Sequence, residues 1–305
     1  LAAIGSTGSL MFFVTGWLNG LSSGFAILVS QWFGAKQYDK MRHYVAMSVY
    51  LAGGCAVLMT AGLLIANEPI LRMMNYSAEI MPEVKQYMGI IYAGLIVTAA
   101  YNSLAAFLRA IGDSKSPLYF LIISAVINVA LDVVFIVVFG MGVEGCAYAT
   151  VIAQAISALL CFIYIVKKFP ILHLTKSDRK ISFQSFGRLL SLGIPMGLQF
   201  SITAIGTIIV QGAVNVYGET YMAGFSAAGK LQNMIMTVFV AFGATVATYV
   251  GQNRGAGRMD RVKSGVRCTQ VMILVWSVIA MAAVCFGGKY MTWLFIDRSQ
   301  TDVIN

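Results

Sequence analysis

The sequence predicts an all-α polytopic membrane protein. Hydrophobic residues make up 59% of the 305 residues and charged residues only 11%, and the mean hydropathy is +0.79. Soluble domains contain about 25% charged residues, so this chain has too few charges to cover a water-facing surface. Its apolar stretches match or exceed the roughly 20 residues that a helix needs to cross a bilayer, and they are much longer than the ~10 residues of barrel strands.

Eight apolar stretches follow one another along the chain, and we expect each to form one membrane-spanning helix. The 30 glycines suit close packing of such helices in lipid. The first residue is Leu, and no signal peptide precedes the first stretch, so we expect the chain to begin inside a longer protein. The predicted spans are 9–33, 44–66, 87–108, 117–139, 145–166, 189–216, 221–250 and 268–286.

The basic residues predict the orientation of these spans. Four alternate segments, which share one side of the membrane, hold 16 of the 21 Lys and Arg residues. By the positive-inside rule that side is the cytoplasm. We expect a multi-pass protein of the plasma (cytoplasmic) membrane. The net charge of +9 is therefore a topology signal, and we expect no nucleic-acid partner because no basic run is interleaved with aromatics in a domain of its own. The four segments are 34–43, 109–116, 167–188 and 251–267.

The chain contains an internal repeat. Residues 29–45 align with residues 250–266, with six identities in 17 positions. Six spans separate the copies, so both run in the same direction, as in a parallel repeat of two lobes; chance similarity of Gly/Ala-rich loops is the alternative. We expect an amino-terminal lobe at 1–166, a cytoplasmic linker at 167–188 and part of a second lobe at 189–305.

One acid, Asp132, lies inside a long apolar stretch. A charge at bilayer depth costs at least ~2.5–3.5 kcal/mol, so such a residue indicates a functional site. Asn128 lies one helical turn before it, and Thr150 in the next span is expected at a similar depth. These three side chains offer a carboxylate and neutral oxygens, which suit H+ or Na+. The alternative is a structural Asp that pairs with polar neighbours or lies near the outer interface.

Polar residues and a proline in other spans are candidates for a transport path or a gate. Pro195, flanked by glycines, is expected to kink or break its helix, although many kinked helices are static. Plentiful Met and aromatic residues suit a cavity for varied apolar cations, and lipid-facing packing explains them equally well. Hydrogen bonding between helices is the alternative role for the amides. The candidates are Gln154, Pro195, Gln199, Gln211 and Asn215.

Motifs of enzymes and cofactor sites are absent from the sequence. It contains no Walker A, HExxH or GxSxG motif, so we expect no enzyme and no ATP-driven pump. The five cysteines form no CxxC pair, and the two histidines have no ligand spacing. We therefore expect no cofactor, and no metal beyond a Na+ ion at Asp132, with an ion gradient as the energy source.

Several motifs resemble the multidrug and toxic compound extrusion (MATE) family, over essentially all 305 residues. The most specific pair is Asn128-x-x-x-Asp132 followed by Gly142-x-x-Gly145-x-Ala-x-Ala-Thr150, and Gln-x-x-Gly-Ala loops occur in both halves. The resemblance implies a two-lobe MATE/MOP-type architecture of six plus six helices, of which this chain would hold helices two to nine. In some members the cation site uses the positions of Asn128, Asp132 and Thr150, with a further Asp from the first helix.

The resemblance also implies a function. We expect a secondary antiporter that exports organic cations, drugs or metabolites in exchange for H+ or Na+, a monomer whose partners are membrane lipid and small, cationic amphipathic substrates. The alternative is a flippase for a lipid-linked oligosaccharide, although no Arg or Lys lies deep in a predicted span. A membrane-embedded enzyme would need a second catalytic group near Asp132, and none is available in these spans.

Overall fold

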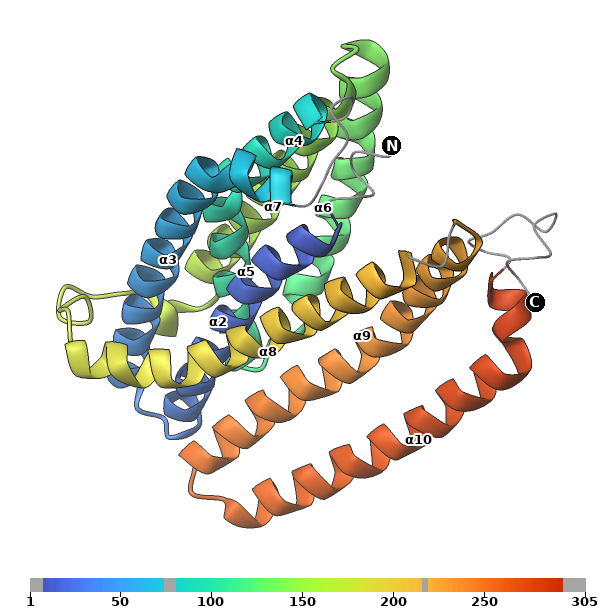
Figure 1. The fold of residues 1–305 in the computed structure, drawn as a ribbon. Helices are drawn as coiled ribbons and strands as arrows, with labels where there is room; N and C mark the ends of the chain where they lie inside the picture. The colour runs from blue at the N-terminus through green and yellow to red at the C-terminus, as the bar shows by residue number, and fades with distance from the viewer. Residues whose placement is uncertain (1–7, 74–80, 216–218, 293–305) are drawn as a thin grey trace. The chain divides into compact units, whose positions relative to one another are not determined.

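A computed structural model describes residues 8–73, 81–215 and 219–292 of the chain. These ranges fold into helices joined by short connections, as Figure 1 shows. The elements are α2 (Gly8–Gly34), α3 (Tyr38–Met73), α4 (Met81–Ala93), α5 (Leu95–Ala110), α6 (Lys115–Val133), the π-helix η1 (Val134–Val138), α7 (Gly142–Lys168), the 3-10 helix η2 (Pro170–Leu172), α8 (Phe183–Asn215), α9 (Glu219–Gly255) and α10 (Met259–Thr292).

Within the described ranges the helices agree in number and position with the eight predicted spans, of which 189–216 ends at a residue outside those ranges. Seven helices are each long and apolar enough to cross a membrane, and α4 with α5 forms an eighth span when the two are taken together. The helices extend beyond the apolar stretches that predicted them. The 36 residues of α3 measure ~54 Å at 1.5 Å per residue, more than the ~30 Å hydrocarbon core, so the ends of α3 extend past the predicted stretch 44–66.

The span predicted at 87–108 is not one straight helix. It is divided at Gly94 into α4 and α5, whose axes differ by 44°. A Cβ atom at Gly94 would lie 2.4 Å from Cγ2 of Val151, so the missing side chain lets α7 pack into the bend. The backbone N–H of Gly94 still donates to the Ile90 carbonyl at 3.0 Å, which carries the backbone hydrogen bonding into the bend.

The span predicted at 117–139 changes its helical type directly after Asp132. The α6 helix ends at Val133, and the next five residues form the π-helix η1. The N–H of Phe139 accordingly donates to the carbonyl five residues back, on Val134, at 3.1 Å. Two glycines with left-handed backbone, Gly140 and Gly142, then turn the chain into α7. Single π turns in helices are frequent at functional sites.

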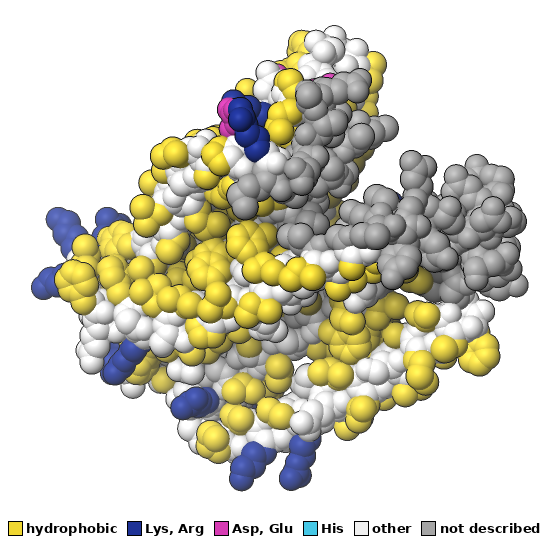
Figure 2. Space-filling model, viewed as in Figure 1, with side chains coloured by type: hydrophobic (Ala, Val, Ile, Leu, Met, Phe, Trp, Pro, Cys, Tyr) yellow, Lys and Arg dark blue, Asp and Glu magenta, His cyan; other side chains and the backbone are white. Residues whose placement is uncertain are grey.

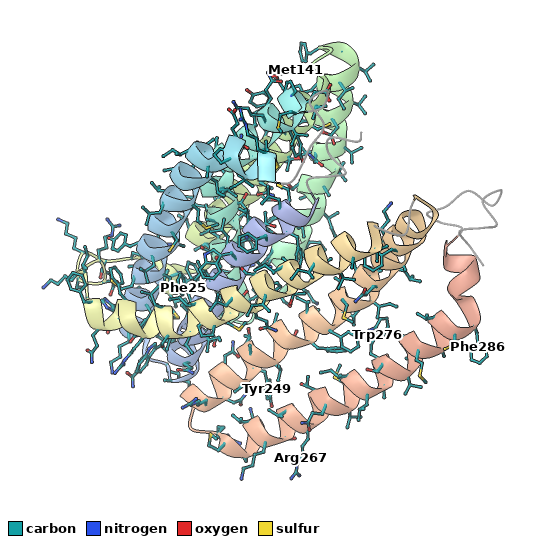
Figure 3. All side chains as sticks on the ribbon, viewed as in Figure 1. Phe25, Met141, Tyr249, Arg267, Trp276 and Phe286 are labelled. Carbon is teal, nitrogen blue, oxygen red and sulfur yellow. The ribbon has the colours of Figure 1, made fainter. Side chains whose placement is uncertain are left out.

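Helices α2 and α8 approach each other through glycines. A Cβ atom at Gly20 would lie 2.5 Å from the carbonyl oxygen of Met196, and one at Gly24 would lie 2.6 Å from Cα of Gly193. Such distances are far below van der Waals contact, so only glycine allows this packing. The aromatic ring of Phe25, labelled in Figure 3, in turn lies where a side chain at Gly193 would be. This contact joins the amino end of α8 to α2.

The two copies of the sequence repeat form the same turn. Between α2 and α3, the N–H groups of residues 35, 36 and 37 donate to the carbonyls of residues 31, 33 and 32. Between α9 and α10, residues 256, 257 and 258 make the same three bonds to residues 252, 254 and 253. Lys36 (φ 56°) and its counterpart Gly257 (φ 71°) are both left-handed. The same three bonds also follow α5, at residues 111, 112 and 113 with a left-handed Gly112, so this turn is a common helix end and chance similarity of the two loops stays an alternative.

The chain divides into two compact units, residues 1–204 and 205–305, with the boundary inside α8. Within the second unit, α9 packs along α10, and a Cβ atom at Gly265 would lie 2.2 Å from the ring of Tyr249 (labelled in Figure 3). Both ends of the predicted linker 167–188 are helical, which leaves residues 169–182 between α7 and α8. The division into a lobe at 1–166, a linker at 167–188 and a second lobe at 189–305 stays a prediction.

Apolar side chains cover much of the protein surface. Figure 2 shows hydrophobic side chains spread across the visible face and Lys and Arg side chains near its margins. Only 6% of the most apolar window of α6 is buried, and its exposed residues include Leu118, Ile122 and Val126. Exposed apolar faces of this extent indicate contact with lipid.

Candidate functional site

The Asp132 carboxylate lies at the carboxyl end of α6 with a buried, unpaired oxygen. Its Oδ1 atom has no hydrogen-bond partner, and neither does the buried Nδ2 atom of Asn128 one turn earlier. A buried polar atom without a partner is costly unless a ligand or another state of the protein satisfies it. Two unpaired groups on one helix face are therefore a candidate ligand site.

Two hydrogen bonds define how α7 lies against this face of α6. The Ser124 hydroxyl donates to the Ala153 carbonyl at 2.6 Å, and the Ser157 hydroxyl donates to the Phe120 carbonyl at 3.1 Å. A step of four residues toward the carboxyl end of α6 therefore corresponds to a step of four residues toward the amino end of α7. This register places Asn128 at the level of Ala149 and Thr150, and Asp132 about one turn nearer the α6–α7 loop.

Thr150 does not join Asp132 directly. Its hydroxyl donates to the Cys146 carbonyl inside α7 at 2.9 Å, and among the described side chains no hydrogen bond links it to Asn128 or Asp132. The carboxylate acts electrostatically on Cys146 of α7 and on Tyr87 of α4. Tyr87 is buried. The acid thus lies on the α6–α7 pair and within electrostatic reach of α4, a neighbour that sequence spacing did not predict.

A cavity of about 290 Å³ lies nearer the middle of the same bundle. Five helices of the first unit line it, and most of the lining side chains carry a hydroxyl or an amide, while none is charged. Ser124 of α6 belongs to this lining and lies eight residues, or ~12 Å of helix, from Asp132. The lining residues are Phe12, Thr15, Gly16, Asn19, Thr98, Tyr101, Asn102, Leu121, Ser124, Gln154, Ser157 and Phe200.

Gln154 is the one predicted path residue that lines this cavity. Its Oε1 atom accepts a hydrogen bond from the Thr98 hydroxyl, which joins α7 to α5. The sequence reasoning missed the polar pairs on α2 and α5. Their signal was present as polar residues four apart on one helix face, at Thr15 and Asn19 and again at Thr98 and Asn102.

The remaining predicted path residues lie on α8. Pro195 does not break its helix, which continues from Phe183 to Asn215. It is exposed, as is Gln199, whose carbonyl accepts a hydrogen bond from Thr203. Gln211 and Asn215 belong to the helix, but their side chains lie outside the described residues. Neither Pro195 nor Gln199 lines the cavity, so the structure does not bring them to the site.

A metal centre finds no support in the described part of the chain. No group of three or more His, Cys, Asp or Glu side chains is placed to hold a metal ion there. Asp132 with the Asn128 amide is the nearest approach to a hard-cation site, with one formal negative charge. That set suits a monovalent cation or a proton better than a divalent ion.

Fold and site together define a polytopic helical membrane protein with a half-buried acid near a neutral polar cavity. The family model MatE matches residues 1–134 and 195–305, and the chain belongs to this family. Members of the family are transporters, so the protein is no enzyme.

The curated relatives include two proteins of Bacillus subtilis (strain 168). Probable multidrug resistance protein YpnP is 30% identical over 301 residues, which cover 97% of this chain and 66% of that protein. Probable multidrug resistance protein YoeA is also 30% identical, over 309 residues that cover 99% of this chain and 66% of that protein. The chain therefore spans about two thirds of the length of these relatives.

Solved structures share the fold. An outward-facing multidrug resistance MATE family transporter of the MOP superfamily superposes with a TM-score of 0.91 at 19% identity, over 100% of this chain and 68% of that chain. A MOP superfamily transporter from Pyrococcus furiosus superposes with a TM-score of 0.90 at 20% identity, over 100% and 68%. The MATE/MOP-type architecture expected from the sequence is thus confirmed.

Proposed function

We propose that this chain belongs to a secondary antiporter that exports organic cations, drugs or related metabolites in exchange for H+ or Na+. The observation that carries the proposal is the unpaired carboxylate oxygen of Asp132 beside the unpaired amide of Asn128, about 12 Å along α6 from a polar cavity. The multidrug resistance names of YpnP and YoeA support the substrate class.

Asp132 is the proposed coupling group. When H+ or Na+ binds, its charge is neutralised, and the cost of holding a bare carboxylate in the bundle is relieved. The Asn128 amide can turn its oxygen toward Na+ or its N–H toward the ionised carboxylate, so it serves either ion. Because α7 packs against α6 and Tyr87 of α4 lies within electrostatic reach of Asp132, a change of the carboxylate charge acts on groups of three helices. The adjoining π-helix η1 is the segment best placed to change its hydrogen bonding.

The cavity is the proposed substrate path. Aromatic faces at Phe12, Tyr101 and Phe200 suit a delocalised organic cation, and the amides and hydroxyls between them supply hydrogen-bond acceptors. The lining contains no Lys or Arg among the described residues, so no observation favours a flippase for lipid-linked oligosaccharides, which would hold a phosphate there. No cofactor takes part in this proposal; the coupling ion is the only inorganic ligand.

The basic loops are the basis for the orientation that we propose for the chain in the membrane. We propose a multi-pass protein of the plasma membrane, monomeric, with segments 34–43, 109–116, 167–188 and 251–267 on the cytoplasmic side. The linker at 167–188 then joins the two lobes on that side.

The test is ethidium efflux from everted vesicles that contain the product of the complete gene with Asp132→Asn, driven in turn by a proton and a sodium gradient. We expect the variant to lose gradient-driven efflux while it still reaches the membrane. Glu144→Gln is the matched control, because it removes a carboxylate from the first turn of α7 and should leave efflux unchanged. Wild-type efflux by the Asp132 variant would refute the coupling role.

A further inference from the structure

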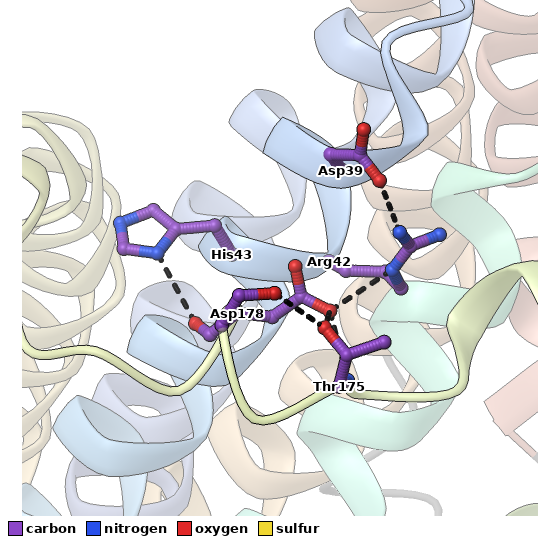
Figure 4. Close-up of polar contacts among 6 residues, drawn as sticks. Asp39, Arg42, His43, Thr175 and Asp178 are labelled. Carbon is purple, nitrogen blue, oxygen red and sulfur yellow. Dashed lines mark hydrogen bonds and ion pairs between the residues drawn. The ribbon is translucent and has the colours of Figure 1, made fainter.

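Asp178 fastens the segment between α7 and α8 to the start of α3. Its Oδ2 atom accepts hydrogen bonds from Arg42 Nε at 3.0 Å, from the Thr175 N–H at 2.8 Å and from the Thr175 hydroxyl at 2.6 Å. Arg42 also pairs with Asp39 on its own helix. Figure 4 shows these contacts, with the segment crossing the first turns of α3. The Asp178 side chain is only 5% exposed, so water does not compete for it.

His43 adds two contacts to the same junction. Its Nδ1 atom lies 3.1 Å from the Asp178 carbonyl, and its Nε2 atom lies 3.0 Å from the hydroxyl of Ser185 in α8. Because a carbonyl only accepts, Nδ1 donates there (Figure 4). Burial alone would disfavour a charged Asp178, but the hydrogen bonds from Thr175 and the ion pair with Arg42 hold the pKa of its carboxyl below the usual range. The segment is therefore fixed.

The fixed segment closes a groove on α3. The groove has a volume of about 220 Å³, with a floor of Ala46, Val49 and Tyr50 and a wall of Leu174 and Arg179. Val49 and Tyr50 are each more than 40% exposed on α3. The groove is thus apolar along the helix and basic at the rim that the segment provides.

The basic rim carries charge that the described protein does not neutralise. The side chain of Arg179 makes no ion pair or hydrogen bond within the described residues, and Lys176 and Lys180 beside it are exposed. Asp178, the one acid in this stretch, is already paired with Arg42. Two apolar side chains follow, Ile181 at 66% and Phe183 at 85% exposure. Free basic groups next to exposed apolar ones are typical of a surface that lies in the headgroup region of a membrane.

We propose that this groove binds one anionic phospholipid, with its phosphate on Arg179 and an acyl chain along Val49 and Tyr50. Val49 lies only five residues, ~8 Å of helix, inside the predicted start of the α3 apolar stretch at 44, so the groove is level with the boundary between headgroups and acyl chains. A free phosphate would leave the apolar floor uncovered, whereas a lipid covers both parts. An anionic lipid matches the unneutralised basic charge better than a zwitterionic one.

This proposal rests on the membrane position of the chain and is independent of ion coupling at Asp132. The test measures lipid retention by native mass spectrometry on the detergent-solubilised product of the complete gene, titrated with phosphatidylglycerol or phosphatidylcholine. We expect Arg179→Gln to weaken phosphatidylglycerol binding by about tenfold or more, as for the loss of one charge-assisted hydrogen bond. Arg254→Gln removes the same charge from the last turn of α9 and should change binding by less than about twofold.

Further variants separate the site from general electrostatic attraction. Asp178→Asn retains Arg179 but releases the segment, and it should weaken phosphatidylglycerol binding without reducing the basic charge. Equal losses for Arg179→Gln and Arg254→Gln, or equal affinity of the wild type for phosphatidylcholine, would overturn the proposal. So would displacement of the lipid by an equal concentration of glycerol 1-phosphate, because the acyl chain would then contribute nothing.

Discussion

The close contact between α2 and α8 can be tested by adding one methyl group. In Gly20→Ala the new Cβ atom would lie 2.5 Å from the Met196 carbonyl oxygen and 2.6 Å from Cα of Gly197. Both are backbone atoms, which cannot turn aside as a side chain can. Since carbon contacts are relaxed at ~3.5 Å or more, the two helices must separate by about 1 Å.

The expected loss follows from a comparison with an open glycine. Gly187, near the start of α8, has no atom within 4 Å of the position that a Cβ atom would take, so Gly187→Ala changes only the intrinsic helix preference. Gly20→Ala gains the same preference, which cancels in the difference between the two variants. What remains is overpacking, for which ~1–3 kcal/mol is typical. Gly20→Ala should be less stable than Gly187→Ala by that amount.

The assay is equilibrium unfolding in mixed detergent micelles with increasing sodium dodecyl sulfate, followed by far-ultraviolet circular dichroism. Gly24→Ala serves as a second test of the same contact, because its Cβ atom would lie 2.6 Å from Cα of Gly193. If Gly20→Ala and Gly187→Ala unfold at the same detergent composition, the helices are not in contact through glycine, and the reasoning fails.

Three further predictions concern the turns, the Asp178 junction and the cavity. Lys36→Gly should stabilise the protein by up to ~1 kcal/mol in the same unfolding assay, because Lys36 has a left-handed backbone, while Gly257→Ala should destabilise it; effects of the opposite sign would contradict the turn geometry. The folded pKa of Asp178 is depressed, so its stabilisation is present above the unfolded pKa of about 3.9 and is lost as the pH falls through the folded pKa. Melting curves should therefore show a constant difference in melting temperature between wild type and Asp178→Asn from about pH 5 to 8. This difference should shrink below about pH 4, and a difference that shrank on raising the pH would contradict a depressed pKa of Asp178. Gln154→Leu leaves the Thr98 hydroxyl without its partner and makes the cavity less polar, so it should change the relative efflux of different drugs rather than abolish efflux, and an unchanged drug profile would argue against the cavity as the path.

Asp132 illustrates how much of the candidate site could be predicted. Its position in an apolar stretch singled it out, and the spacing of four placed Asn128 on the same helix face. The partners from other helices were harder to predict. Thr150 bonds to its own helix, and Cys146 and Tyr87 are the groups on which the carboxylate acts electrostatically. The α6–α7 register depends on Ser124 and Ser157. The sequence of either helix alone does not indicate such contacts.

The sequence by itself determined the number and type of the spans. In lipid every backbone N–H and C=O must find a partner within the protein. An apolar stretch of about 20 residues therefore forms a helix, which satisfies these groups within the segment. Sequence similarity between residues 29–45 and 250–266 likewise predicted a repeat, and the two turns share their hydrogen bonds. These features depend on neighbours along the chain.

Only the tertiary structure decided how the helices meet. The bend at Gly94 depends on Val151 of α7, the glycine contact of Gly20 depends on Met196 of α8, and the polar cavity gathers side chains from five helices. Apolar residues cover most faces of every span, so hydrophobic pattern does not say which face turns toward which partner. That choice is made by small residues and hydrogen bonds between distant segments, which exist only once the chain has folded.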